Sequence, residues 1–382
     1  MTVAAIVCEY NPFHNGHQYL IDEARRITKA DYIIGILSGD FVQRGEPALI
    51  NKWARAKACL QGGADMVVEI PCFASFAPAN LYAYYSVLTA HMLGVVDFLV
   101  FGSESQKSTE ELSKLAYVTS GSDNLFTEKF RANIDAGKSY PRSVADSLGR
   151  ELGPNDILGI EYIKALKKLN SNITAVPLPR VNGENISSAA NIRANIRNNH
   201  IVSTWMPPHS FNILTEEINE GRGPVYIDNY QQAILASFRA KSIEEIRALP
   251  YVSEGLEYSL KKNALAHGTL EEFLTSVTCA RYTKSRIRRI SIASMTGINA
   301  QDLQHTPGFI KILGLSKSAG GLMEAINKSS LVPASTSLAK LKGSDPYMAS
   351  LSCKISDVYA LGYPVPSKRI GDQEYIHSAV FK

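Results

Sequence analysis

Residues 4–17 read Ala-Ala-Ile-Val-Cys-Glu-Tyr-Asn-Pro-Phe-His-Asn-Gly-His, and this stretch decides the fold. It opens with a short apolar run, and a helical pattern follows over residues 17–27. Runs that are apolar throughout are typical of strands covered on both faces. The connecting loop therefore leaves the carboxyl end of a first strand and enters a helix, which is where an open α/β sheet binds its ligands.

The same alternation continues along the first half of the chain. Further apolar runs occupy residues 32–37, 65–70, 97–102 and 173–178. Helical patterns lie between them, over residues 53–61, 80–93 and 157–169. Strands that alternate with helices indicate βαβ units, so we expect an α/β protein with a Rossmann-like parallel sheet. Residues 108–153 are helical and more polar, and we interpret them as an insertion between the fourth and fifth strands.

The pattern changes after about residue 200. Helical stretches cover residues 235–249, 256–267 and 270–295, a short helix and a Gly-rich turn are expected within residues 308–321, and the final residues mix strand and loop. We therefore predict a Rossmann-like catalytic domain over residues 1–200 and a mostly helical C-terminal domain over residues 201–382. The chain has 40 Lys and Arg against 36 Asp and Glu, and the whole excess lies in the second region. A polyanionic partner is expected there.

Composition excludes several classes of protein. The 382 residues are 45% hydrophobic and 20% charged, which is typical of a soluble globular chain with more than one domain. The apolar stretches are interrupted well before the ~20 residues of a membrane span, and the N-terminus has no basic segment of a signal peptide. Five cysteines without a C-x-x-C pair argue against a disulfide framework and a Cys-only zinc site. We expect a cytoplasmic protein with no membrane partner.

The loop after the first strand carries two histidines at a spacing that suits phosphate. His17 would lie on the first helical turn, beside free N–H groups and the positive end of the helix dipole. Gly16 lets the backbone approach an anion. His14 and His17 can both donate to phosphate oxygens, whose negative charge grows as the α-phosphate is attacked. Metal ligation is the alternative, but a zinc site would need a third ligand and none is apparent nearby.

Phe13-His14-Asn15-Gly16-His17 resembles the H-x-G-H signature of the nucleotidylyltransferase superfamily. The second signature, roughly I-S-S-x-T-x-I-R, is similar to residues 186–193, which read Ile-Ser-Ser-Ala-Ala-Asn-Ile-Arg. Arg193 matches the arginine that contacts the terminal phosphates. Ala190 replaces the usual hydroxyl, so Ser187 or Ser188 is expected to cap the helix and contact the anion. An ordinary Ser-capped helix is the alternative for this segment.

The stretches at residues 38–48, 63–71, 101–104 and 155–162 resemble the bacterial tRNA(Met) cytidine acetate ligase family. This resemblance extends over almost the whole chain. It implies that acetate is activated with ATP to acetyl-adenylate and pyrophosphate. The acetyl group then passes to the N4 amine of the wobble cytidine of elongator tRNA(Met), which gives N4-acetylcytidine. ATP, acetate and tRNA(Met) are thus the expected substrates. We expect Mg²⁺ with the ATP, bound either by ATP alone or also by the protein, and we assign no metal-ligating residues.

The motifs and the resemblance together assign the site residues. Catalysis is expected from His14, His17 and Arg193. ATP is expected on the first strand and its loop, which comprise Val7, Cys8, Glu9, Tyr10, Asn11, Pro12, Phe13, His14, Asn15, Gly16, His17, Gln18, Tyr19 and Leu20. Four further ATP contacts are expected at Gly102, Asn155, Arg180 and Ser188. A helix cap after Pro154 is the alternative reading of Asn155.

Polar residues also follow the second strand. Asp40 and Gln43 are expected to orient a substrate or Mg²⁺ at the same edge, although Asp40 could be only a turn residue. Glu46 and Lys52 could serve there too, or could pair with each other at the surface.

A basic segment marks the second region. Residues 273–300 contain no Asp or Glu but include Arg281, Lys284, Arg286, Arg288 and Arg289. On one helix Arg281, Lys284 and Arg288 would share a stripe, and we predict that they bind tRNA phosphates. A solvated face is the alternative. Residues 314–321, Gly-Leu-Ser-Lys-Ser-Ala-Gly-Gly, resemble a phosphate loop, but we expect no strand–loop–helix context for them.

Two other functions compete with the ligase. A small-molecule adenylyltransferase of the pantetheine-phosphate or nicotinamide-mononucleotide type shares both signatures but does not need a basic second half. A non-enzymatic tRNA-binding protein could retain a nucleotide site. Release of pyrophosphate in the presence of acetate separates the three.

Overall fold

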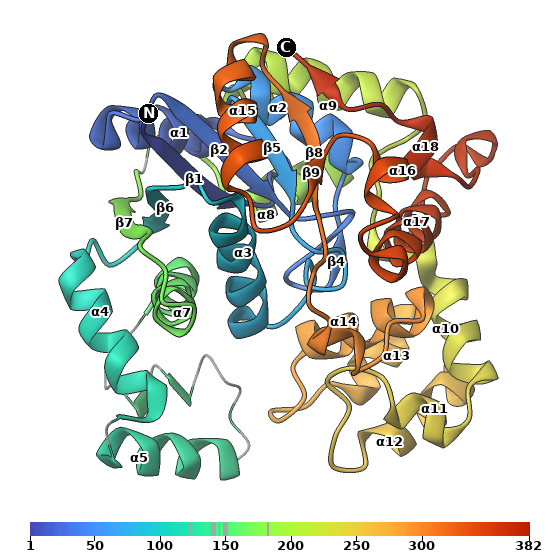
Figure 1. The fold of residues 1–382 in the computed structure, drawn as a ribbon. Coiled ribbons are helices and arrows are strands. Elements are labelled where there is room, and N and C mark those ends of the chain that lie inside the picture. Colours follow the sequence, from blue (N-terminus) through green and yellow to red (C-terminus); the bar gives the residue numbers. More distant parts are fainter. Residues whose placement is uncertain (123, 137, 139–142, 145, 148–151, 182) are drawn as a thin grey trace.

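The computed structural model describes residues 1–122, 124–136, 138, 143–144, 146–147, 152–181 and 183–382. In this part of the chain an eight-stranded sheet has the order β10-β8-β5-β2-β1-β6-β7, and β9 pairs with β8 (Figure 1). The strands from the first half are parallel: β1 (Val3–Cys8), β2 (Tyr32–Leu37), β5 (Met66–Glu69), β6 (Phe98–Ser103) and β7 (Thr174–Pro179). They match the predicted apolar runs and confirm the α/β fold with a Rossmann-like sheet.

The strand order reverses beside β1. From β1 the chain first adds β2 and β5 on one side, and it then returns to add β6 and β7 on the other side. The connections leave β1 and β6 in opposite directions, so the carboxyl ends of these two strands mark the switch point of the sheet. Open sheets bind ligands at this point. The predicted phosphate-binding loop follows β1 directly and therefore lies at the switch point.

Helices cover both faces of the sheet, which is why its strands are apolar throughout. Neighbouring residues of β1 face opposite ways: Ala5 and Ile6 are both fully buried but belong to different hydrophobic clusters. The Ile6 face packs against α1 (Asn15–Thr28), α2 (Lys52–Gln61), α8 (Ala189–Arg197) and α9 (Pro208–Asn219). The Ala5 face packs against α3 (Ala79–Leu93), α4 (Thr109–Tyr117) and α7 (Pro154–Lys168).

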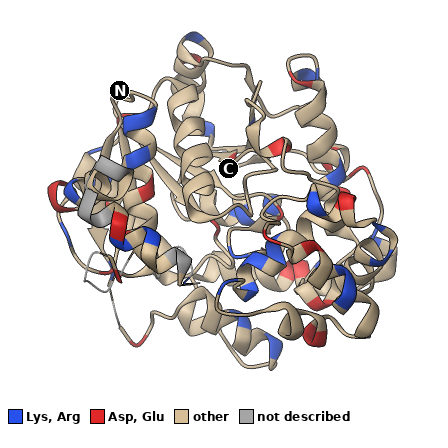
Figure 2. Cartoon of the chain, turned by 90° about the horizontal axis from the view of Figure 1, so that it is seen from below, with Lys and Arg blue, Asp and Glu red and all other residues tan. Residues whose placement is uncertain are grey.

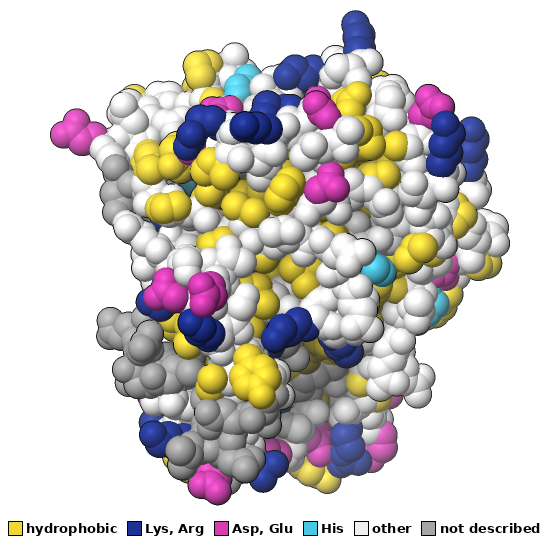
Figure 3. All heavy atoms as spheres, turned by 60° about the vertical axis from the view of Figure 1, so that its left-hand side comes forward, with side chains coloured by type: hydrophobic (Ala, Val, Ile, Leu, Met, Phe, Trp, Pro, Cys, Tyr) yellow, Lys and Arg dark blue, Asp and Glu magenta, His cyan; other side chains and the backbone are white. Residues whose placement is uncertain are grey.

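The expected insertion is helical where it is described. It contains α4, a short π-helical turn at Val118–Ser122 and α5 (Asn124–Asp135), while residues 123, 137, 139–142, 145 and 148–151 lie outside the described part. Figure 3 shows this side of the molecule, where side chains of both charge signs are interspersed with hydrophobic ones. Among the described residues no helix is both long enough and apolar enough to cross a membrane.

The second region places a group of helices below the sheet in Figure 1: α10 (Gln231–Ala240), α11 (Ile243–Arg247), α12 (Leu256–Ala266), α13 (Leu270–Val277) and α14 (Lys284–Thr296). The prediction of one helix over residues 270–295 is wrong. Thr278 has extended backbone and ends α13, and Thr283 caps a new helix by accepting a hydrogen bond from the Arg286 N–H. The basic segment is therefore divided by a loop.

The final residues are also more helical than predicted. They include α15 (Gly320–Ser329), α16 (Leu338–Leu341), α17 (Pro346–Ala360) and α18 (Gln373–Ile376). Asp345 caps α17 by accepting from the Met348 N–H at 2.9 Å, and Pro346 stands at the first helical position. Asp followed by Pro is a helix-start signal that the sequence already carried.

Three strands of the sheet come from the second region. β8 (Ile310–Leu315) runs antiparallel to β5, and β10 (Val380–Phe381) pairs with β8, while β9 (Ala334–Ser335) pairs with β8 off the main path. The short helix expected near residues 308–321 is thus a strand followed by a turn and α15. The sheet draws on both predicted regions, and the division at residue 200 stays a prediction.

A buried network of charges ties these parts together. The Lys52 ammonium on α2 contacts Glu69 at 2.7 Å, Asp40 at 3.7 Å and Glu374, and Lys311 on β8 also pairs with Glu374. All five side chains are at most 5% exposed. Buried charges require partners, and here α2, β5, β8 and α18 supply them to one another.

Candidate active site

The two histidines hold each other in one tautomer. His14 is the N-cap of α1, and its Nδ1 accepts from the Gly16 N–H at 3.1 Å. The Nδ1 of His17 accepts from the His14 N–H at 3.2 Å, and the two rings stack with centroids 3.6 Å apart. Because both Nδ1 atoms accept, both protons are assigned to Nε2. Each ring therefore has an Nε2–H donor that no described residue accepts.

Both rings are neutral in this setting. Burial, followed by the Arg180 charge, lowers the pKa of His14 to about 4. Burial, His14 and Arg180 together lower the pKa of His17 well below its usual range. The pair thus offers neutral N–H donors at the positive end of α1, an arrangement suited to an anionic oxygen.

The other residues of the loop divide between core and ligand edge. Cys8, Tyr10 and Phe13 have buried side chains in the cluster beneath the loop, so only their backbone faces the edge. Gln18 donates to the Gly62 carbonyl at 2.8 Å. Among the other predicted ATP contacts of this segment, Asn11 and Pro12 are buried. Partly exposed are Val7, Tyr19 and Leu20.

The second signature lies against the first. Arg193 on α8 donates to the Asn11 carbonyl at 2.7 Å, and Asn15 donates to the Asn185 carbonyl at 2.7 Å. Ser188 is the N-cap of α8 and accepts from the Asn191 N–H at 3.2 Å. The cap expected from the two serines is thus formed by Ser188.

Glu46 joins the signature helix to the basic segment. It lies on the hairpin of β3 (Phe41–Val42) and β4 (Glu46–Pro47), and it pairs with Arg193 at 3.2 Å and with Arg288 on α14. Of the two alternatives for Glu46 and Lys52, a mutual pair at the surface is wrong. Lys52 is 1% exposed and belongs to the buried network, whereas Glu46 has one arginine on each side.

A carboxylate that sequence reasoning missed organises the loop after β6. Glu104 accepts from the Asn155 backbone and side-chain N–H groups at 3.1 and 2.7 Å, and it pairs with Arg180 at 3.1 Å. The cap reading of Asn155 needs correction, because the N-cap of α7 is Gly153 and Glu104 supplies the acceptors. Gly102 lies beside the Arg180 side chain with no backbone crowding. The only sequence signal for Glu104 was its place directly after a strand.

The residues after β2 are held within the protein. Asp40 is 2% exposed and accepts from the Ser356 hydroxyl at 2.8 Å and from the Lys52 N–H at 3.3 Å. This geometry favours a structural role over the substrate or metal role expected for Asp40. The Gln43 N–H donates to Glu9 at 2.9 Å, and its carbonyl accepts from Arg289.

Acidic residues outside the basic segment pair with part of its positive charge. Arg281 pairs with Glu254 at 3.0 Å, and Lys284 pairs with Glu271 at 2.7 Å. Arg281 also lies in the loop before α14, so the predicted single helical stripe with Lys284 and Arg288 is wrong. Figure 2 shows Lys and Arg intermixed with Asp and Glu in this part of the molecule. A segment without its own acids thus has acids beside it in the fold.

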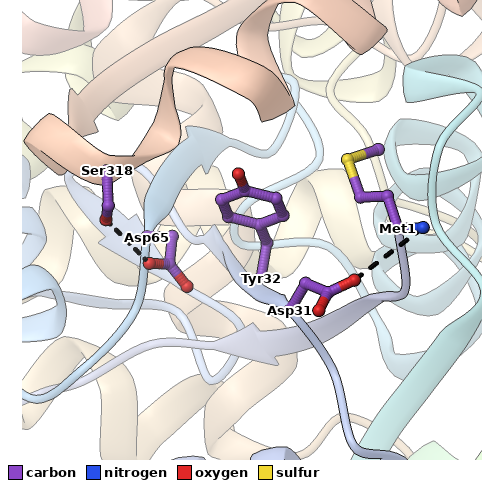
Figure 4. A pocket seen from close by; sticks show the side chains of 5 residues that line it. All are labelled: Met1, Asp31, Tyr32, Asp65 and Ser318. Carbon is purple, nitrogen blue, oxygen red and sulfur yellow. Dashed lines mark hydrogen bonds and ion pairs between the residues drawn. The ribbon is translucent and has the colours of Figure 1, made fainter.

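A pocket of about 440 Å³ lies at the opposite edge of the sheet (Figure 4). Its lining comes from the amino ends of β2 and β5 and from the turn after β8: Met1, Asp31, Tyr32, Asp65 and Ser318. The expectation that residues 314–321 lack a strand–loop–helix context is wrong, because β8 precedes them and α15 follows. They nevertheless lie at this far edge, where Asp31 and Asp65 oppose an anion.

Metal-ligating side chains do not gather in the described part of the chain: it contains no group of three His, Cys, Asp or Glu residues placed to hold an ion. The carboxylates at the ligand edge of the sheet contact protein groups instead. Mg²⁺ stays an expectation, and the phosphates of ATP are what would bring it.

A sheet that reverses beside β1, with neutral imidazole donors after that strand, is the architecture of a nucleotidyl transferase. The chain belongs to the HIGH nucleotidyl transferase family, whose model matches residues 1–374.

Within that family its similar relatives are tRNA(Met) cytidine acetate ligases. The one from Acetivibrio thermocellus is 34% identical over 414 residues, with 100% of each chain covered. The one from Thermosipho africanus is 36% identical over 358 residues, with 87% of this chain and 84% of the relative covered. The structure of Thermotoga maritima TmcAL bound with α-thio ATP matches with a TM-score of 0.93 and 33% identity, covering 100% of this chain and 99% of that one.

Proposed function

We propose that this chain is an ATP-dependent tRNA(Met) cytidine acetate ligase. The observation that carries the proposal is the neutral pair of His14 and His17, on a loop that Arg193 contacts at the Asn11 carbonyl, in a chain similar over its full length to such ligases. A small-molecule adenylyltransferase would share the pair but not this full-length similarity. Elongator tRNA(Met) as substrate implies work in the cytoplasm.

Acetate activation is the first reaction of the proposal. An acetate oxygen attacks the α-phosphorus of ATP, the bond to pyrophosphate breaks, and acetyl-adenylate forms. The Nε2–H groups of His14 and His17 donate to the oxygens on which charge builds up, and such donors are worth most in the transition state. Arg193 and Arg180 would bind the terminal phosphates, and Ser188 would add an anion contact. The nucleotide would rest on residues 7–20, Gly102 and Asn155.

Each arginine first has to exchange a partner. Arg193 is 21% exposed and paired with Glu46, and Arg180 is 43% exposed and paired with Glu104. Partly exposed ion pairs contribute little, about 0–1 kcal/mol, so polyphosphate can replace a carboxylate at modest cost. Mg²⁺ held by the ATP would neutralise part of the phosphate charge.

The second region would hold the tRNA. Arg281, Lys284 and Arg288 are the proposed phosphate contacts, on a loop and on the start of α14. α14 lies against the β3–β4 hairpin, which follows β2 at the ligand edge of the sheet. RNA bound there would lie at the same edge of the molecule as the acetyl-adenylate.

Two measurements test the proposal. Acetate-dependent exchange of pyrophosphate into ATP reports activation, and mass spectrometry of nucleosides from tRNA(Met) incubated with ATP and acetate reports N4-acetylcytidine. We expect both signals. Exchange that requires a phosphopantetheine or nucleotide acceptor instead of acetate would favour the small-molecule adenylyltransferase. Binding of tRNA without any exchange would favour the non-enzymatic reading.

A further inference from the structure

The two reactions of the proposed function make different demands on the site. Acetate is already an anion, so it attacks phosphorus without losing a proton. The N4 amine of cytidine is neutral, and its attack on the acetyl carbonyl leaves one proton to be removed per acetyl group. A positioned base contributes roughly 10²–10⁴-fold to such a step. The site therefore needs a proton acceptor that serves only the second reaction.

Among the residues that the structure describes, most proton acceptors at the ligand edge already have hydrogen-bond or ion-pair partners. The Nδ1 atoms of His14 and His17 accept backbone N–H groups, and their Nε2 atoms carry protons. Asp40 lies in the buried network. Glu46 is held between two arginines, and Glu104 accepts four protein hydrogen bonds at the start of α7 and from Arg180.

Glu9 is the exception at this edge. It is the first residue after β1, immediately before the histidine loop, and its side chain is only partly buried. The Gln43 N–H donates to Oε1 at 2.9 Å, and no described residue donates a hydrogen bond to Oε2. The Arg55 guanidinium donates to the Glu9 carbonyl at 2.8 Å and fixes the backbone from below. One carboxylate oxygen is thus held in place while the other is free.

We propose that Glu9 is the base of the transfer step, a role that rests on the proposed function. The amine nitrogen forms a bond to the acetyl carbon, and the bond from that carbon to the adenylate oxygen breaks. The electron pair leaves with AMP, and the proton of the amine passes to Glu9 Oε2. Glu9 then returns this proton to solvent or to the departing AMP phosphate.

The surroundings of Glu9 support a proton-accepting role. Burial raises its pKa from the ordinary value, while the Gln43 hydrogen bond and the nearby arginines oppose that rise. The charged and titratable groups that act on it, or on which it acts, are Arg193, Arg44, Arg55, Arg289, Tyr82 and Tyr162. A base works only when deprotonated, so the transfer rate should fall as the pH drops through the pKa of Glu9.

The test separates the two reactions in the full-length protein. Glu9→Gln should slow single-turnover acetylation of tRNA(Met) on the order of 10²-fold or more beyond any loss of acetate-dependent pyrophosphate exchange. The acid limb in the pH profile of the transfer rate should disappear. Glu9→Asp should restore part of the rate and the limb. Glu23→Gln, a surface carboxylate on α1 paired with Arg26, is the matched control and should change neither reaction.

Opposite outcomes overturn the proposal. Transfer by Glu9→Gln at the wild-type rate, or an unchanged acid limb, would exclude Glu9 as the base. Equal loss of exchange and transfer would make Glu9 an ATP contact instead. If Glu9→Gln does not fold, Glu9→Asp decides, because transfer must fall further than exchange relative to the wild-type protein. Failure of the proposed function is distinct: the wild-type protein itself would then form no N4-acetylcytidine.

Discussion

His17 is both a proposed catalytic donor and part of a small stacked group. Loss of one transition-state donor costs on the order of 10²–10³-fold in kcat, so His17→Ala should slow acetate-dependent exchange by that factor. Its ring also contacts His14 and Tyr10, and we expect a stability loss of about 1–2 kcal/mol. His17→Gln keeps a side-chain N–H donor and should lose less activity. Exchange rates and thermal melting of both variants check this, and wild-type turnover in His17→Ala would make the residue incidental.

His14 gives stability a pH dependence. Its folded-state pKa of about 4 lies below the ordinary value of 6.5, so the unfolded chain binds the proton first as the pH falls. The contribution of neutral His14 to the free energy of unfolding is present in full above pH 6.5 and is lost as the pH falls toward 4. About 2 kcal/mol is lost between pH 7 and 5. His14→Asn keeps an N-cap acceptor but cannot titrate. Urea unfolding at both pH values should show a smaller difference for the variant, and equal differences would refute the assignment.

The sequence predicted His14, His17 and Arg193 because those residues lie in compact motifs. It did not predict their partners. Arg193 and Glu46 are 147 residues apart, and Glu46 and Arg288 are 242 apart. Local pattern contains no information on such pairs, since either side chain alone looks like an exposed charge. Glu9 was expected only as an ATP contact for the same reason: its free oxygen becomes evident only once its neighbours are known.

At the scale of elements, the acidic residues beside the basic segment should compete with tRNA for its cations, which the sequence alone did not indicate. Arg281 and Lys284 must leave Glu254 and Glu271 before they bind phosphate. Glu254→Gln with Glu271→Gln should therefore tighten tRNA(Met) binding, whereas Arg281→Ala with Lys284→Ala should weaken it. Removal of each side chain that binds a phosphate should reduce the salt slope of binding by roughly 0.7–0.9. Both ion pairs are exposed, so the folding stability should change little.

Filter binding across a salt series measures the affinity for tRNA(Met) and its salt slope. The exchange assay is run on the same proteins. Exchange should be unaffected in both double variants. If neither pair of substitutions alters tRNA binding, the RNA site lies elsewhere, and Lys317 or Arg369 would be the next residues to examine.

The parallel core was predictable because its strands are apolar on both faces and its helices are separated by clear loops. β8 was not, because a short apolar run with one lysine reads equally as a buried helix segment. Only the fold shows why Lys311 is tolerated in that strand: Glu374 lies beside it. The loop that splits residues 270–295 was missed because threonines carry little signal until one of them is seen to cap a helix.

At the scale of the whole molecule, the buried network fastens the C-terminal residues to the sheet. Lys52→Met would leave Asp40, Glu69 and Glu374 with one lysine among them, and breaking a buried pair costs about 3–5 kcal/mol. Lys57→Met, on the same helix with an exposed partner, is the control and should cost less than about 1 kcal/mol. Urea unfolding gives the free energy of unfolding of both variants. Equal losses would show that the buried network contributes no more to stability than an exposed ion pair.

The position of β8 in the sheet has a consequence for how the protein is made. The edge of β5 is finished by a strand that the ribosome produces much later, after α14. At a synthesis rate of roughly 5–20 residues per second, this leaves an apolar strand edge uncovered for on the order of 10–50 s. The nascent chain thus carries its histidine loop early but covers the edge of β5 only when residue 315 has left the exit tunnel, so chains released before that point are open to aggregation and to proteolysis.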